Sequence, residues 1–230
     1  MKKILVTLLF AFLMLAGTDA YAQFSFGGNY TYVLETSVVS GADKEIYPMH
    51  GFQAGIGYNI PFGEDAIVGF QPCVNVAMLF GANGSGANRN SFVLQELPRY
   101  KELVINAPMN FTVGFSQDCD FNVYVYFGPV IQYGFISETS VPGKEVFTLR
   151  SNGLQYQQPY TLNNYKGDTT NNVGADRRQF NMLLGGGLGI QWGDNLNFLF
   201  GYERSFMNYS LQTENKIVRN YFKAGIAFAF

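Results

Sequence analysis

The sequence predicts an all-β protein, an eight-stranded antiparallel up-and-down transmembrane β-barrel. Three observations predict it. Apolar and polar residues alternate with a period of two along most of the chain, charged residues make up only 14% of the 230 residues, and short and long connections alternate. A typical soluble domain has about 25% charged residues. The net charge of −2 gives no reason to expect a nucleic-acid partner.

The first 22 residues are predicted to be a cleaved secretory signal peptide. A basic start (MKK), an apolar run over 4–15 and the small-x-small pattern at 20–22 follow one another in the expected order. The apolar run is shorter than the about 20 residues that a helix needs to span a bilayer, which argues against a membrane anchor. The mature domain is therefore predicted to be residues 23–230, a single domain.

Eight strands are predicted, and several show the alternation clearly. In the second, Phe52, Ala54 and Ile56 share a face opposite Gln53 and Gly55. In the last, the apolar face carries Phe222, Ala224, Ile226, Phe228 and Phe230. The third and fifth strands repeat this arrangement from Val68 and from Val123. The predicted ranges are 24–34, 50–60, 66–80, 99–115, 121–137, 179–192, 196–209 and 218–230.

The connections predict how the strands are joined. Three are short, at 61–65, 116–120 and 193–195, and four are long, at 35–49, 81–98, 138–178 and 210–217. The two kinds alternate strictly, as in an up-and-down barrel with tight turns at one end and long loops at the other. A Greek-key sandwich gives no reason for such alternation.

Charge decides which face of the strands points outward. A soluble lipocalin-type barrel also alternates, with its apolar face inward, but its outer surface needs many charged side chains. The ranges 24–34, 51–60, 66–80, 103–115, 122–137 and 179–192 contain no Asp, Glu, Lys or Arg. Their polar face is made of Gly, Asn, Gln, Thr and Ser, which suits a narrow interior. We therefore expect the aromatic face to contact lipid.

This assignment predicts the location and orientation of the protein. An outer-membrane barrel places both chain termini and the short turns in the periplasm and its long loops outside the cell. Side chains just fill the interior of an eight-stranded barrel, so we do not expect an open pore.

Several segments resemble porin-family outer-membrane barrels of Bacteroidetes. They are the start of the mature chain with FGG at 26–28, YKELVINAPMNFTVGF at 100–115, YVYFGP at 124–129, LGGGLGIQ at 184–191 and GYE at 201–203. Ala107 interrupts the usual Ile-Pro pair of the second segment. The group includes barrels similar to PorT, which are linked to type IX secretion. The resemblance implies an outer-membrane barrel with no catalytic residues. It also implies that Phe230, with Phe228 on the same face, is the signal read by the barrel assembly machinery.

Catalytic and metal sites find little support in the sequence. His50 is the only histidine, and an enzyme that modifies lipids would need it as the base, with a serine (Ser37 or Ser40) and an acid (Asp43 or Glu45) from the neighbouring loop. We expect instead a polar rim residue and a protein that is not an enzyme. One histidine and two cysteines do not make a zinc site, and Asp168 lies in only a fragment of a calcium loop. No metal or cofactor is predicted.

The two cysteines are too far apart in the predicted barrel to form a disulfide readily. Cys73 is expected inside the barrel at mid-strand, and Cys119 in a periplasmic turn. Free thiols, or a bond from Cys119 to another chain, are favoured.

Charged residues on the inward face predict an ion-pair network in the lumen. If the last hairpin is centred near 212–213, Glu203 and Lys223 face each other directly across the two strands. Arg219 lies further along the same face, and Glu102 is expected to reach in from the fourth strand. We interpret this set as a structural plug, with a gated proton or solute path as the alternative.

The connection 138–178 is the most probable contact surface for a partner. It is rich in tyrosine and amide side chains, which suit contact with a protein or a glycan; the candidates are Tyr156, Tyr160, Asn163, Asn164 and Tyr165. A long connection without structure is usually functional or disordered, so a loop without a partner is the alternative. The predicted function is non-enzymatic and structural, or surface interaction. A narrow porin, or a barrel associated with type IX secretion, is second. The other predicted partners are outer-membrane lipids.

Overall fold

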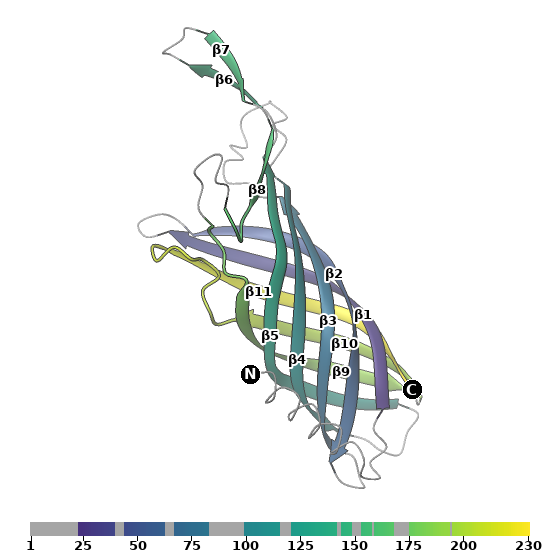
Figure 1. Cartoon of the computed structure of the whole chain (residues 1–230). Coiled ribbons are helices and arrows are strands. Elements are labelled where there is room, and N and C mark those ends of the chain that lie inside the picture. Colours follow the sequence, from purple (N-terminus) through teal and green to yellow (C-terminus); the bar gives the residue numbers. More distant parts are fainter. Residues whose placement is uncertain are drawn as a thin grey trace, which may run out of the picture.

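The computed structural model describes residues 23–39, 44–62, 67–82, 99–115, 121–141, 144–148, 153–157, 159–167, 175–193 and 195–230. The predicted signal peptide lies outside these ranges. Eight long strands form one barrel (Figure 1): β1 Gln23–Val39, β2 Glu45–Phe62, β3 Val68–Ala82, β4 Arg99–Gly114, β5 Phe121–Val141, β9 Phe180–Trp192, β10 Leu196–Ser205 and β11 Asn215–Ala229.

The hydrogen-bonded ladder closes on itself. The strand order is β4-β3-β2-β1-β11-β10-β9-β5, and β4 also pairs with β5. Every pairing is antiparallel, and β1 pairs with β11 from Ser25↔Ala229 to Val39↔Asn215. Apart from the β1–β11 closure, barrel strands that follow each other in the chain lie side by side. The predicted eight-stranded antiparallel barrel is therefore confirmed.

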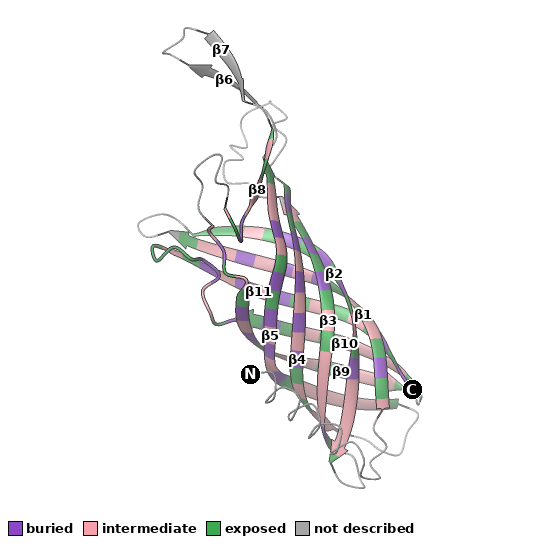
Figure 2. Cartoon of the chain, in the orientation of Figure 1, coloured by how far each residue is buried: buried purple, intermediate pink, exposed green. Residues whose placement is uncertain are grey.

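Burial alternates along the strands as the outward-facing aromatic pattern predicts. Phe52 is 68% exposed, whereas the next residue, Gln53, is 3% exposed. Figure 2 shows buried and exposed bands along several of the long strands. The exposed residues form a continuous apolar outer surface, which includes Phe26, Val74, Phe111, Phe127 and Phe200. No helix in the described part of the chain is long and apolar enough to cross a membrane.

Several strands extend further at the loop end of the barrel than the sequence predicts. β1 continues to Val39, β2 begins at Glu45 and β5 continues to Val141. Charged and small polar residues there interrupt the apolar alternation, but the backbone ladder continues through them. β10 is shorter than predicted and ends at Ser205.

The long connection between β5 and β9 is not structureless, so that prediction is wrong. It contains β6 Lys144–Thr148, β7 Gly153–Gln157 and β8 Tyr160–Asn163. β6 and β7 pair only with each other, and Figure 1 shows them beyond the outer ends of the barrel strands. β8 pairs with the end of β5 from Glu138↔Asn163 to Val141↔Tyr160.

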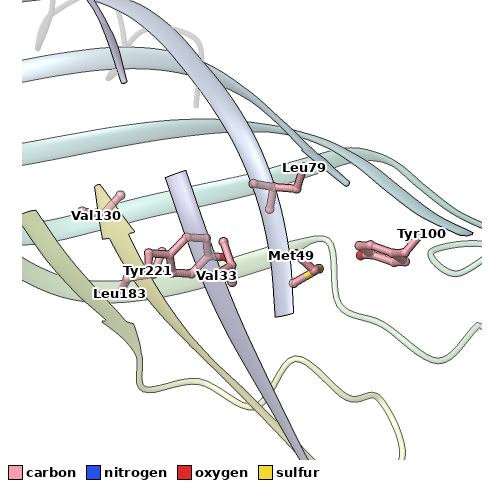
Figure 3. Close-up of a cluster of buried hydrophobic side chains, with 7 residues drawn as sticks. All are labelled: Val33, Met49, Leu79, Tyr100, Val130, Leu183 and Tyr221. Carbon is pink, nitrogen blue, oxygen red and sulfur yellow. The ribbon is translucent and has the colours of Figure 1, made fainter. Parts of the chain in front are cut away.

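Buried apolar side chains line the half of the lumen nearer the long connections. Seven strands contribute one residue each to this ring, shown in Figure 3: Val33, Met49, Leu79, Tyr100, Val130, Leu183 and Tyr221. Below the ring, towards the chain termini, small and amide side chains such as Ser25, Gly57 and Asn110 line two cavities of about 80 Å³ each. The lumen therefore has a filled outer half and a looser inner half.

Candidate functional site

Arg219 of β11 lies at the centre of a buried charge cluster in the outer half of the lumen. Its side chain is 0% exposed and reaches three other strand residues. Nε donates to Glu35 Oε2 of β1 at 2.7 Å, one terminal nitrogen donates to Glu102 Oε2 of β4 at 2.5 Å, and the other donates to the Tyr100 hydroxyl at 2.9 Å. A single guanidinium therefore ties together strands from opposite parts of the sheet order.

A second guanidinium enters the cluster from outside the barrel strands. Arg177 belongs to the connection between β8 and β9, where it bridges to Ser210. It binds Glu35 through both terminal nitrogens, at 2.6 and 2.7 Å. The planar fork of arginine matches a carboxylate in this two-bond arrangement. Glu35 is thus held by two arginines at once.

Aromatic rings complete the surroundings of both arginines. The Arg177 guanidinium lies 4.8 Å from the centre of the Tyr100 ring, and the Arg219 guanidinium lies 4.2 Å from that of Tyr209. Ring faces attract cations at such distances. Two arginines and two glutamates give the cluster no net formal charge, and pairing of this kind is what a buried charge requires.

The electrostatics of Arg177 follow from these contacts. Burial opposes its positive charge, but the attraction of the Glu35 carboxylate outweighs burial, so the pKa of Arg177 lies above its ordinary value. Arg177 therefore stays charged at any pH that the protein meets.

Two neighbouring residues of the β8–β9 connection also fold into the barrel mouth. The Tyr165 hydroxyl donates to Glu102 Oε1, and Asn164 Nδ2 donates to Ser137 Oγ at 3.0 Å. Gly134 makes room for Tyr165, because a Cβ at that position would collide with the phenol. The connection therefore caps the lumen through specific contacts.

A chain of polar groups lies beside the cluster. Tyr209, on the connection between β10 and β11, donates to Gln132 Oε1 and lies 2.8 Å from the Tyr221 hydroxyl. Gln132 Nε2 in turn donates to Asn106 Oδ1 at 2.8 Å. A residue from a second connection thus helps to fill the outer half.

Glu203 and Lys223 form a separate ion pair in the inner half, at 2.6 Å. The predicted direct register is wrong by two positions: Lys223 lies opposite Gly201, and Glu203 lies opposite Tyr221. The two side chains meet diagonally. Gly185 on β9 supplies the space, because a Cβ there would lie 3.0 Å from the Cβ of Glu203.

The five predicted contact residues lie in different environments, some in the lumen and some outside it. Asn164 and Tyr165 are buried in the lumen and are not part of an external surface, which corrects their assignment. Asn163 Oδ1 accepts bonds from the backbone nitrogens of Tyr165 and Lys166 and so stabilises the turn. Tyr160 is half-buried on β8. Tyr156 lies on β7, and its side chain is outside the described part of the structure.

The other predicted positions take part in no site among the described residues. His50 points outward, and Nδ1 bonds the Tyr30 hydroxyl. Glu45 lies five residues before His50 on the same strand, so the two residues are about 16 Å apart along it. The register partner of Glu45 is Ser37. Ser40, Asp43, Cys119 and Asp168 lie outside the described residues, whereas Cys73 is a free thiol in the lumen. The described residues contain no group of three metal-binding side chains.

The aromatic residues at the chain end lie on the outer surface of the barrel. Phe228 is 49% exposed and Phe230 is 75% exposed. Phe230 is tied to the start of β1, since its nitrogen donates to the Phe24 carbonyl at 2.8 Å.

Sequence reasoning missed Glu35, Arg177, Tyr100 and Tyr209. Glu35 could have been found, because it continues the inward parity of β1 one residue beyond the predicted end of that strand. Arg177 and Tyr209 lie on connections, where the sequence has no periodic pattern that shows whether a side chain faces the lumen. The structure shows that a loop arginine completes the charge balance of the strand residues.

Comparisons with known proteins find only distant structural similarities. No protein-family model matches the sequence, and no curated protein matches it. Among solved structures, the chain is similar to Neisserial surface protein A, with 11% identity, 90% of this chain and 97% of that one covered, and a TM-score of 0.45. It is also similar to Ail, the attachment invasion locus protein of Yersinia pestis, with 11% identity, 91% and 99% coverage, and a TM-score of 0.41. The outer membrane enzyme PagL shows 8% identity, 88% and 98% coverage, and a TM-score of 0.41.

Proposed function

We propose that this protein is an integral barrel of the bacterial outer membrane with a closed lumen, and that it acts as a non-enzymatic structural or surface-interaction protein. The apolar outer surface supports the membrane location, because aromatic and aliphatic side chains are exposed on all eight strands. A closed ladder also leaves no free sheet edge in lipid. Outer-membrane lipids are thus its first partners, and the barrel assembly machinery, reading Phe228 and Phe230, is its partner during biogenesis.

The single observation that carries the closed-lumen proposal is the cluster formed by Arg219, Glu35, Glu102 and Arg177. It joins β1, β4 and β11 to a loop residue across the interior. The ring of buried apolar residues lies in the same half of the lumen, and we therefore propose that the lumen is closed to ions there. With the termini in the periplasm, this closure lies on the external side.

The surface role is supported by the β6–β7 hairpin. The backbone of this hairpin pairs with no barrel strand, whereas Asn164 and Tyr165 of the same connection are buried. A protein or glycan ligand is the partner chemistry that we propose for it.

The test of the surface role replaces residues 144–157 with a short Gly-Ser linker and leaves 160–178 intact. We expect the barrel to keep its heat-modifiable migration on gels, because the lumen contacts of Tyr165 and Arg177 remain. Cross-linking on whole cells should then lose specific adducts that the wild type forms. An unchanged set of adducts would refute the surface role and leave the barrel assignment standing.

A narrow channel is the second candidate, and the inner cavities favour it. One of them has a mainly polar lining, which includes Gln23 and Asn59 near the start of β1 and the end of β2. At about 80 Å³ each they hold water, but they are well below the 300–1,000 Å³ of typical ligand pockets. A role in type IX secretion is supported by sequence resemblance alone. A lipid-modifying role would use His50 as the base, but no acidic or serine side chain lies beside His50 among the described residues.

A further inference from the structure

A groove of about 940 Å³ lies on the outer surface of the barrel, over β5, β9, β10 and β11. Its floor is Gly186 of β9, which pairs with Phe127 of β5 on one side and Tyr202 of β10 on the other. Both aromatic side chains face outward and are more than 40% exposed. The groove is therefore a trough between two aromatic walls.

The trough depends on the absence of a side chain at Gly186. On the outward face of β9, Gly186 is flanked by Leu184 and Leu188, which are both exposed. A Cβ on Gly186 would lie 2.7 Å from the Tyr126 carbonyl oxygen and 3.2 Å from the Phe127 Cβ. The local backbone therefore fits glycine and leaves an apolar hollow of acyl-chain width between ring walls.

Two cations lie at the loop end of the groove. Arg204, near the end of β10, and Lys216, near the start of β11, both line the groove and are exposed. Neither forms an ion pair with any described residue, whereas Arg177, Arg219 and Lys223 are all paired. Along β10 the outward order is Phe200, Tyr202, Arg204, which runs from apolar through amphipathic to cationic. This is the order of hydrocarbon, interface and headgroup in one leaflet.

We infer that this groove binds a phosphorylated lipid of the external leaflet, with one acyl chain in the trough and its phosphate between Arg204 and Lys216. The inference rests on the proposed outer-membrane location. Charge complementarity selects the phosphate: a phosphate offers several acceptor oxygens and negative charge to a guanidinium and an ammonium that form no ion pair with the described residues. The apolar walls select the chain, and glycine at position 186 lets it lie against the backbone.

The test uses the full mature chain in nanodiscs of phosphatidylcholine doped with bis-phosphorylated lipid A, and in a parallel set with chemically dephosphorylated lipid A. Lipids that stay bound after release from the disc are counted by native mass spectrometry. We expect the wild type to retain phosphorylated lipid A in preference to the dephosphorylated form. The double variant Arg204→Gln, Lys216→Gln should weaken this retention by about 25-fold, since each cation at a membrane surface contributes about a factor of five.

The matched control removes two other exposed cations at the loop end of the barrel. Lys44→Gln, just before β2, with Arg99→Gln on β4 causes the same change in net charge away from the groove, and should leave retention unchanged. A second variant, Gly186→Val, fills the trough and should reduce retention of both lipids. If Gly186→Val fails to fold, the two double charge variants still test the inference.

Three results would overturn the inference. They are equal retention of the two lipid A forms by the wild type, equal losses in the groove and control double variants, or a dimer that buries the groove without lipid. A protein that inserts and folds but shows one of these results refutes only the lipid site. A protein that fails to insert into any bilayer refutes the proposed location itself.

Discussion

The two halves of the lumen use the same inward strand positions in different ways. In the outer half, β1 contributes Val33 and Glu35, and β11 contributes Arg219 and Tyr221, all of them buried. In the inner half, the same two strands contribute Ser25, Gly27, Gly225 and Ala227. The difference is one of side-chain volume: large groups interlock around the ion cluster, whereas small groups leave the two cavities.

This contrast indicates which half of the lumen closes the barrel and which half should tolerate substitutions. The outer half combines buried charges, aromatic rings and residues from two connections, so each group there has several partners. The inner half has one ion pair, Lys223–Glu203, beside cavity space. Buried charges without water depend fully on their partners. We therefore expect substitutions in the outer half to cost more stability than equivalent changes in the inner half.

The largest expected effect is that of Arg219→Met. It leaves Glu102 without its arginine and Glu35 with only Arg177, in a site without solvent. The free energy of unfolding should fall by about 3–5 kcal/mol, the cost of breaking a buried pair. Urea titration of the protein in lipid vesicles measures it. Arg99→Met, which changes an exposed arginine outside the groove, is the control, and a similar small loss in both variants would contradict the assigned importance of the cluster.

A smaller effect is expected for Lys223→Met in the inner half. Glu203 then loses its partner, but it lines a cavity that water can enter. The expected loss is about 1–3 kcal/mol in the same urea titration. A loss equal to that of Arg219→Met would remove the distinction between the two halves.

An effect of similar size but confined to the loop end is expected for Gly134→Ala, which tests how the β8–β9 connection is held. The added methyl group displaces the Tyr165 phenol and breaks its bond to Glu102. We expect overpacking to cost about 1–3 kcal/mol and hydrogen exchange to rise over 160–167, with the barrel strands unchanged. Gly28→Ala is the control, because a Cβ there approaches nothing closer than 3.6 Å. Unchanged exchange at 160–167 would mean that Tyr165 does not anchor the connection.

The architecture could be predicted from the sequence because it depends on a pattern that repeats in every strand. Phe52 and Gln53 occupy successive positions of β2, so one side chain must face outward and the other inward. The exposed one is Phe52, as its apolar character predicts for a surface in lipid. The strand ends were less predictable, since Glu35 and Glu45 break the apolar alternation while the hydrogen-bonded ladder continues past them.

The site residues could be predicted only on strands, because alternate strand positions face inward and outward. Glu102, Glu203, Arg219 and Lys223 sit on strands, and their inward positions follow from counting. Their partners do not, because register depends on where the chain turns: Lys223 lies opposite Gly201, two positions from the predicted partner. Arg177 and Tyr165 reach the lumen by tertiary folding of a connection, for which the sequence carries no periodic signal.

The closed lumen is tested most directly by single-channel recording in planar bilayers. Insertion is verified in the same preparation by heat-modifiable migration and by protease protection of the barrel. We predict that the inserted wild type shows no discrete conductance steps, and that the triple variant Tyr165→Ala, Arg177→Ala, Tyr209→Ala, which removes the loop contribution to the outer half, shows small steps. Discrete steps from the inserted wild type that stay unchanged in the triple variant would contradict the closed lumen.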